Sequence, residues 1–223
     1  MKIGIMQPYF FPYIGYFQLI HSVDIYANLD HVSFMKRSYM VRNTIRNGNT
    51  ISLQVNKGSQ NRKCNEVTVN FENRWIDKNI KTLQFLYSKE KNFDEIMETI
   101  IIPNFKNIEI SVSEFNFKII RDICVLLDIN PKFINTTFGI TDKKRGDGLI
   151  DICKKYECNT YINAIGGMSL YEKEYFRNHG IDLNFCEMKK SIILDNPYMS
   201  ILDLLFLYPL DHIKKEITKY DLV

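Results

Sequence analysis

The residues best suited to chemistry follow an apolar segment that ends at Leu29. Asp30 and His31 come first, and either side chain could accept a proton as a general base. Guanidinium and ammonium groups follow closely, and such groups bind phosphate oxygens through charge-assisted hydrogen bonds. The stretch therefore predicts recognition of a phosphate-bearing ligand beside a catalytic acid–base group. Its polar and cationic members are Lys36, Arg37, Arg42, Asn43 and Arg46.

The alternative is that this stretch is a solvated basic connection between two elements. Phe34, Tyr39 and Met40 are interleaved with its cations. Apolar side chains of this size favour a packed segment over one that is free in solution. We therefore favour the functional interpretation.

A second candidate lies in "QPYFFPYIG", directly after the first apolar run. Its two prolines fix the backbone, and Gly15 allows a helix to begin close to a ligand, with its first amides facing a crevice. The alternative is that the aromatic rings of this loop pack under a neighbouring hairpin. The side chains predicted to hydrogen-bond or stack on a planar or sugar-bearing group are Gln7, Tyr9, Tyr13 and Tyr16.

Two glycine-containing turns complete the candidate set. Gly166 and Gly167 stand between a predicted strand and a helix that Ser169 would cap, where backbone amides can hold an anion or a sugar hydroxyl. A Gly-Gly pair is common in turns, and the full GxGxxG pattern is missing. Another turn, "KKRGDG", could close over phosphates or stay exposed. Its charged residues are Lys143, Lys144, Arg145 and Asp147.

Metal and covalent chemistry are not expected. The four His residues are isolated and show no metal-ligand spacing. No Ser or Cys stands in the strand–turn–helix context of an activated nucleophile. We therefore predict no residue as a metal ligand.

The elements that must position these residues alternate between strand and helix. Residues 2–6 are predicted to form a buried strand, 14–21 a helix and 23–29 a second strand. This βαβ unit favours a parallel, Rossmann-like sheet, in which ligands bind beyond the carboxyl ends of the strands. Later strands are predicted at 131–137, 159–165 and 181–188, and later helices at 146–157, 169–180 and 199–217, the last interrupted at Pro209.

The middle of the chain departs from this alternation. Residues 50–55 and 66–71 alternate in polarity and predict a β-hairpin outside the main sheet. Helical spacing then predicts helices at 75–87, 93–105 and 111–129. We expect one α/β domain over residues 1–223, with a hairpin insertion at 44–75 and a helical section at 76–128.

Composition limits the remaining classes. The net charge of +3 is too small to argue for nucleic acid by itself, and five Cys without close pairing indicate a reducing cytoplasm. Neither a secretory segment nor a membrane span is predicted. The apolar tail "SILDLLFLYPLDHI" would complete the core or meet a second subunit, which leaves a homo-oligomer open.

Several motifs resemble the WbqC-like protein family. They are "IMQPYFFPYIGYFQLI", "LDHVSFMKRSY" with Arg42-Asn43, "LIDICKKYECNTYINAIGGMSLY" and "PYMSILDLLF", and together they span nearly the whole chain. The resemblance implies a role with O-antigen and other surface-polysaccharide gene clusters, and transfer of glycine or another acyl group to an amino sugar.

A fainter resemblance is to the HIGH-type nucleotidylyltransferase superfamily, whose ligases adenylate a carboxylate before forming an amide. Tyr13-Ile14-Gly15-Tyr16 would occupy the HxGH position, so both histidines of that motif are missing. A tyrosine can hydrogen-bond a phosphate but cannot supply a cationic imidazole. This resemblance leaves ATP with Mg²⁺ open as cofactors.

The leading hypothesis is an N-acyltransferase that acts on a nucleotide-linked amino sugar. Asp30 or His31 would remove the amine proton, and the cations and tyrosines would bind the nucleotide-linked sugar or another phosphate ligand. Two alternatives remain: a non-catalytic binding or scaffold protein of the same pathway, and an ATP-dependent adenylating ligase. No nucleic-acid partner is expected.

Overall fold

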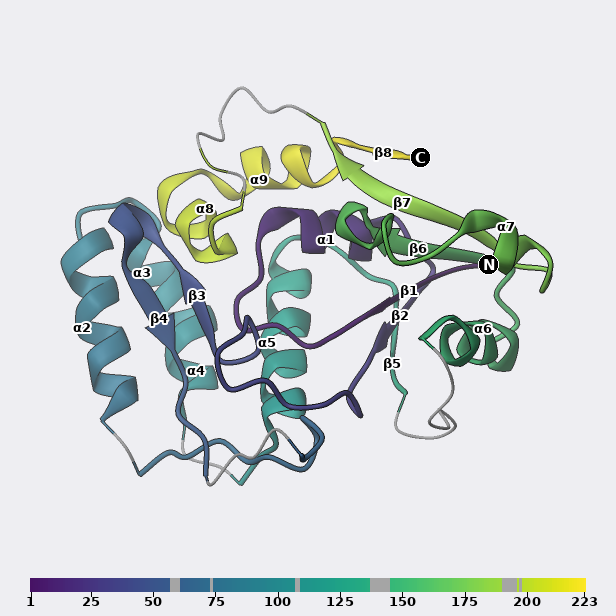
Figure 1. The fold of residues 1–223 in the computed structure, drawn as a ribbon. Coiled ribbons are helices and arrows are strands. Elements are labelled where there is room, and N and C mark those ends of the chain that lie inside the picture. The colour runs from purple at the N-terminus through teal and green to yellow at the C-terminus, as the bar shows by residue number, and fades with distance from the viewer. Residues whose placement is uncertain (57–60, 73, 107–108, 137–144, 190–195, 197) are drawn as a thin grey trace.

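A computed structural model describes residues 1–56, 61–72, 74–106, 109–136, 145–189, 196 and 198–223. Its centre is a six-stranded sheet with the order β5-β2-β1-β6-β7-β8 (Figure 1). Neighbouring strands are parallel except for the final pair, in which β8 runs antiparallel to β7. This order is that of a doubly wound nucleotide-binding sheet, so the predicted α/β, Rossmann-like fold is confirmed. The strands are β1 Lys2–Met6, β2 Ile25–Asn28, β5 Lys132–Asn135, β6 Thr160–Ala164, β7 Asp182–Met188 and β8 Tyr220–Leu222.

Alternating side chains along β1 face two different cores. Ile3 and Ile5 are buried against one helix layer. Gly4 faces the other layer, where a Cβ atom would lie 2.7 Å from Leu19 Cδ2. The missing side chain at Gly4 therefore lets the first helix lie close against the sheet, beside the loop that leads into it.

Helices cover both faces of the sheet (Figure 1). One buried cluster joins strand residues to helices of the first layer, and a second joins the opposite face of the sheet to two other helices. The first layer contains α1 (Ile14–His21), α5 (Val112–Leu126), α8 (Ile201–Leu207) and α9 (Leu210–Ile217), and the second contains α6 (Arg145–Lys155) and α7 (Lys173–Arg177).

A helical section with a small hairpin lies beside the sheet (Figure 1). Trp75 contacts Phe105 and Phe115 edge-to-face, and all three belong to the same buried cluster as α1. The section is therefore packed on the sheet's own core. Its elements are β3 (Arg42–Thr44), η1 (Arg46–Gly48), β4 (Thr50–Ser52), α2 (Trp75–Tyr87), α3 (Phe93–Ile96), the π-helical turn η2 (Met97–Ile101) and α4 (Ile102–Asn104).

The hairpin differs from the predicted one. Residues 42–44 pair with 50–52, because Asn47 and Gly48 adopt φ values of 58° and 71° and turn the chain there. An Asn-Gly pair is the stronger hairpin signal, and it decides the pairing. Residues 66–71 meet the stretch after β4 through two backbone hydrogen bonds, from Asn56 N–H to Thr68 O (3.0 Å) and from Asn70 N–H to Gln54 O (2.9 Å).

The helix predicted over 169–180 is also shorter in the structure. The 3₁₀ turn η3 (Ile165–Gly167) follows β6, and α7 begins only after Glu172. Met168 and Leu170 are exposed, so this part of the chain has no apolar face to bury as a helix. Ser169 is therefore not the cap.

Candidate functional site

The strand order reverses between β1 and β6: successive strands are added toward β5 on one side, from β1 to β2, and toward β8 on the other side, from β6 to β7. A cavity of 330 Å³ lies beyond the carboxyl ends of these strands, the place where open α/β sheets bind ligands. We call it the switch-point pocket. Its lining is Ile5, Met6, Gln7, Tyr9, Tyr13, Leu29, Leu149, Tyr161, Asn163, Ala164, Gly166, Gly167, Leu170 and Tyr171.

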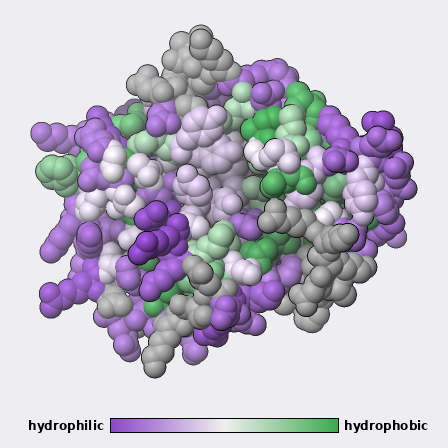
Figure 2. Space-filling view, in the orientation of Figure 1, coloured by the Kyte–Doolittle hydropathy of each residue, from purple (hydrophilic) through white to green (hydrophobic). Residues whose placement is uncertain are grey.

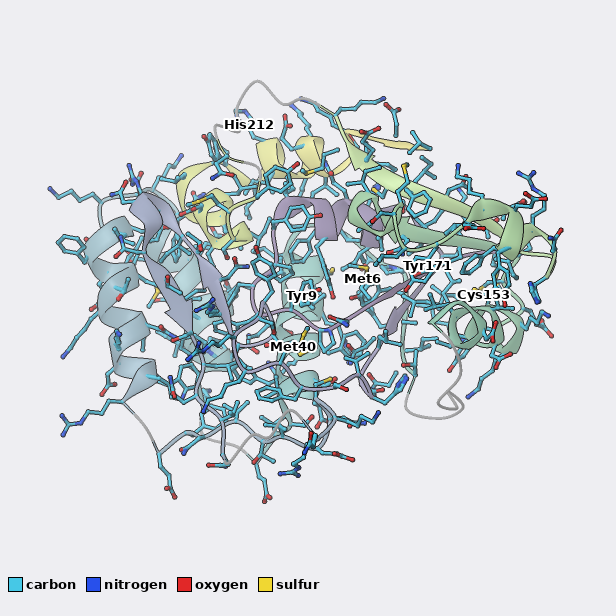
Figure 3. All side chains as sticks on the ribbon, viewed as in Figure 1. Met6, Tyr9, Met40, Cys153, Tyr171 and His212 are labelled. Atoms are coloured by element: carbon cyan, nitrogen blue, oxygen red, sulfur yellow. The ribbon has the colours of Figure 1, made fainter. Side chains whose placement is uncertain are left out.

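Figure 3 labels three residues that line this pocket. Met6, Tyr9 and Tyr171 lie in a row across the middle of the face in Figure 3. The same part of Figure 2 is weakly hydrophilic, with apolar patches beside it. The pocket thus combines an apolar body with a few polar groups, as small-molecule sites do.

Five predicted residues line the switch-point pocket. Gln7, Tyr9 and Tyr13 come from the loop after β1, and the two glycines come from η3. Gly166 leaves space open, since a Cβ there would meet nothing within 4 Å. Gly167 instead receives the side chain of Asn163, with which a Cβ would collide. These residues, far apart in the sequence, therefore share one site.

The tyrosines of the pocket are hydrogen-bond donors at neutral pH. Burial is the main cause that raises the pKa of Tyr13 to about 12, and burial also raises the pKa of Tyr9. Tyr9 donates its hydroxyl hydrogen to Gln7 Oε1 at 3.2 Å. Protonated hydroxyls on an aromatic wall suit a sugar or a planar ring.

A second cavity of 480 Å³, which we call the arginine pocket, lies beside the hairpin. The side chains of Arg37 and Arg42 are exposed there, so it offers two guanidinium groups to an anion. The rings of Tyr9 and Tyr39 are 5.7 Å apart between centroids and connect the two pockets. The lining is Arg37, Ser38, Tyr39, Arg42, Asn43, Thr44 and Thr50.

Buried amides hold the loop between the pockets in place. Asn116 Nδ2 donates to Pro8 O at 3.0 Å and to Met40 O at 2.8 Å, so it joins the loop after β1 to the loop after β2. Ser200 Oγ donates to Phe11 O at 2.9 Å. Phe11 has φ 44°, a backbone conformation that is uncommon for a residue with a side chain. The surrounding contacts maintain this conformation.

Two predicted binding residues support this loop from within. Tyr16 is buried, and its hydroxyl donates to Gln7 O at 2.7 Å and contacts the Tyr26 hydroxyl. Asn43 Nδ2 donates to Phe11 O at 2.7 Å. Tyr16 therefore positions the pocket wall and does not face a ligand, contrary to the prediction. Asn43 borders the arginine pocket with its amide already bound.

Gly15 serves packing within α1. A Cβ at Gly15 would collide with the Tyr13 ring and would lie 3.0 Å from Met188 Sδ. The glycine thus lets Tyr13 lie back over the start of the helix. Gly15 does not line the pocket itself, but it sets the position of Tyr13, which does.

Asp30 and His31 lie just past the carboxyl end of β2. His31 Nδ1 is 3.4 Å from Asp30 Oδ1 and 3.4 Å from Thr136 Oγ1. Cys64 Sγ donates to the backbone oxygen of Asp30 at 2.8 Å. Leu29, one residue earlier, lines the switch-point pocket, so the pair stands beside its wall and is not part of the lining.

None of the other charged residues predicted for the site is found lining either pocket within the described part of the chain. Lys36 is exposed and lines neither one. Arg46 Nη1 binds Glu90 Oε1 at 2.7 Å. Asp147 accepts a hydrogen bond from the Tyr175 hydroxyl. Lys143, Lys144 and the side chain of Arg145 lie outside the described residues.

Sequence reasoning missed several members of the site. Asn163, Tyr161 and Tyr171 line the pocket, and Asn116 and Ser200 brace its loop. Position relative to the end of β6 could have indicated Asn163. Among the described residues there is no group of three or more His, Cys, Asp or Glu side chains arranged to hold a metal ion. None of the helices described is long and apolar enough to cross a membrane.

Fold and site together define a Rossmann-like α/β protein with a cavity at the switch point of its sheet. The model of the WbqC-like protein family matches residues 7–215, and the chain belongs to this family. The chain is 26% identical over 217 residues to an uncharacterized protein of Mycobacterium tuberculosis, Rv1507c. That match covers 92% of this chain and 93% of the relative. No solved structure matches the chain.

Proposed function

We propose that the protein transfers an acyl or aminoacyl group to the amine of a nucleotide-linked amino sugar in surface-polysaccharide biosynthesis, in the cytoplasm. The observation that carries this proposal is the pairing of two pockets across Tyr9 and Tyr39. One pocket presents guanidinium groups and the other presents tyrosines with an apolar floor. A ligand with both a diphosphate and a ring system would fill both.

The roles of the binding residues follow from their chemistry. Arg37 and Arg42 hold the diphosphate, because planar guanidinium groups bind phosphate oxygens through two hydrogen bonds at once. Tyr9 and Tyr13 contact the ring system, and Gln7 is oriented by the Tyr9 hydroxyl. Gly166 leaves room for a ligand hydroxyl or phosphate to approach the backbone.

The acid–base role belongs to Asp30 and His31. In the reaction, the amine attacks the carbonyl carbon of an activated acyl donor, such as an acyl-CoA or an acyl-adenylate. The new amide bond forms as the bond to the leaving group breaks, and the nitrogen loses a proton. The Asp30–His31 pair accepts that proton, with Thr136 and Asp30 fixing the ring of His31 through Nδ1.

The adenylating alternative is less well supported by the start of α1. Tyr16 occupies the second histidine position of the HIGH-type motif, and its hydroxyl is bound inside the protein. That hydroxyl is therefore not directed at a nucleotide phosphate.

A thermal-shift screen tests the proposal. The panel contains UDP-, GDP- and dTDP-linked amino sugars, acyl-CoA, CTP and ATP. We expect stabilisation by one nucleotide sugar. Stabilisation by ATP alone would favour the adenylating ligase, and no shift with any member of the panel would contradict the proposed ligand.

Two substitutions separate catalysis from binding. Arg42→Ala removes an exposed side chain, so we expect an unchanged melting temperature and a loss of nucleotide-sugar affinity of about tenfold or more. Asp30→Asn should retain binding and lose product formation, measured by mass spectrometry with the donor identified in the screen. Lys154→Ala, at an exposed position on α6, is the matched control. If Asp30→Asn forms product at the original rate, a binding or scaffold role is favoured.

A further inference from the structure

The positive charge of this protein is concentrated in one stretch. Residues 31–65 contain seven Lys and Arg residues and no Asp or Glu. The whole chain carries +3, so the remainder is acidic at −4, the difference between +3 and +7. Charge of one sign gathered in one region attracts a partner of the opposite sign.

Helix α2 extends this positive region on the far side of the hairpin. Arg74, Lys78 and Lys81 are exposed and line a hollow of 540 Å³ together with Asp77 and residues of the hairpin turn and the later part of α2. Asn49 lines this hollow, and its neighbour Thr50 lines the arginine pocket, so the two hollows border the hairpin on either side. We call the surface formed by Arg74, Lys78 and Lys81 the basic face.

Large apolar side chains project among these cations. Phe85 lines the α2 hollow and is 86% exposed, while Tyr39 in the arginine pocket is 59% exposed. In Figure 2 the part of the molecule over α2 and the hairpin is largely hydrophilic. Exposed apolar groups set in a cationic surface are the composition of proteins that bind the interface of anionic membranes.

The charged residues that line the α2 hollow leave it positive. Arg46 is paired with Glu90 and does not belong to the basic face. Asp77 is the one acid that lines the α2 hollow within the described residues. Lys89, near the end of α2, is exposed as well.

We propose that the basic face docks on an anionic phospholipid bilayer. Arg74, Lys78 and Lys81 bind headgroup phosphates, and Phe85 enters the boundary between headgroups and acyl chains. A single-stranded nucleic acid would also meet cations and aromatic rings, but its bases bind by stacking on rings. Among the described residues that line the α2 hollow, Phe85 is the one aromatic ring, which is too few for the successive stacking contacts of a single strand.

Vesicle co-sedimentation of the full chain tests this proposal. The probes are vesicles of phosphatidylcholine alone and vesicles in which about one-third of the lipid is phosphatidylglycerol. We expect binding to the anionic vesicles, little binding to the neutral ones, and loss of binding at high salt. K78Q/K81Q should weaken binding roughly 25-fold, and Phe85→Ser roughly tenfold.

Matched variants keep the result interpretable. Lys132→Gln with Lys154→Gln removes two exposed cations outside the basic face, and Val125→Ser removes an apolar side chain that is 71% exposed on α5. These variants should bind like the unchanged protein. Equal binding to neutral vesicles, no binding, or equal losses in the control variants would overturn the proposal. So would binding of a single-stranded oligonucleotide, lost in K78Q/K81Q, without vesicle binding.

The test is independent of the proposed enzymatic function. Lys78, Lys81 and Phe85 line neither the switch-point pocket nor the arginine pocket. Nucleotide-sugar stabilisation should therefore be the same in K78Q/K81Q as in the unchanged protein. Failure of one proposal leaves the other standing.

Discussion

At the scale of single residues, the candidate site depends on buried amides that bind backbone carbonyls. Asn116 is fully buried and donates to Pro8 O and Met40 O. Pro8 precedes Tyr9, and Met40 follows Tyr39. One side chain thus fixes the backbone next to both rings that connect the pockets, without lining either pocket.

Asn116→Ala should destabilise the protein by roughly 2–4 kcal/mol, because two buried carbonyl groups lose their donor. The unfolding free energy from urea denaturation measures this effect. Affinity for the ligand found in the thermal-shift screen should fall as well, since Tyr9 and Tyr39 are no longer fixed relative to each other. Asn130→Ala, at an exposed position, is the control. Equal stability of the two variants would show that Asn116 does not hold the loops.

At the scale of elements, the turn η3 places two adjacent glycines in different surroundings. A Cβ at Gly167 would collide with the amide of Asn163, which is itself packed beside the pocket. A Cβ at Gly166 would stand in open space. One glycine is therefore required for packing, and the other keeps the pocket open.

Gly167→Ala should cost about 1–3 kcal/mol of stability, the usual cost of overpacking. Gly166→Ala should leave the unfolding free energy within about 1 kcal/mol of its original value and weaken ligand binding. Urea denaturation and ligand titration of both variants separate the two effects. Unchanged ligand affinity in Gly166→Ala would remove Gly166 from the site.

Elements whose signals are local were predictable from the sequence. The bounds of β1, α1 and α2 agree with the predicted 2–6, 14–21 and 75–87, because apolar periodicity alone decides them. Within the described residues, the predicted pairing of 50–55 with 66–71 is present only as an antiparallel bridge between Val55 and Val69. Residues 50–52 pair instead with 42–44 across the turn at Asn47-Gly48.

The different roles of Tyr13 and Tyr16 could not be predicted from the sequence. Tyr13 and Tyr16 are three residues apart, but Tyr16 is buried, and its hydroxyl donates to Gln7 O and contacts the hydroxyl of Tyr26 on β2. The brace from Ser200 joins positions 189 residues apart. Such contacts depend on tertiary packing, and no local pattern records them.

At the scale of the whole molecule, the two cores enclose all five cysteines as thiols. Burial raises the pKa of Cys64, Cys153 and Cys186 from 9.0 to about 12. It likewise raises that of Tyr13 from 10.0 to about 12. Folding thus favours the protonated form of each of these groups.

Stability should therefore fall with rising pH in the alkaline range. Below pH 9 the thiols hold their protons in the folded and the unfolded state, and their full contribution to stability is present. Above pH 9 the unfolded chain loses these protons first, so it binds fewer protons than the folded protein. One such thiol gives a slope of about −1.4 kcal/mol per pH unit until the pH approaches the folded pKa near 12.

Urea denaturation between pH 7 and pH 11 measures this slope, and Cys186→Ala identifies one contributor. The variant removes a thiol that is buried beside α1 and should reduce the slope by up to the value for one proton. Thiol reagents should react with the folded protein at pH 8 far more slowly than with the denatured chain, because the thiolate is the reactive form. A free energy of unfolding that stays constant through the alkaline range would contradict the burial of these thiols and, with it, the packing of both cores around the sheet.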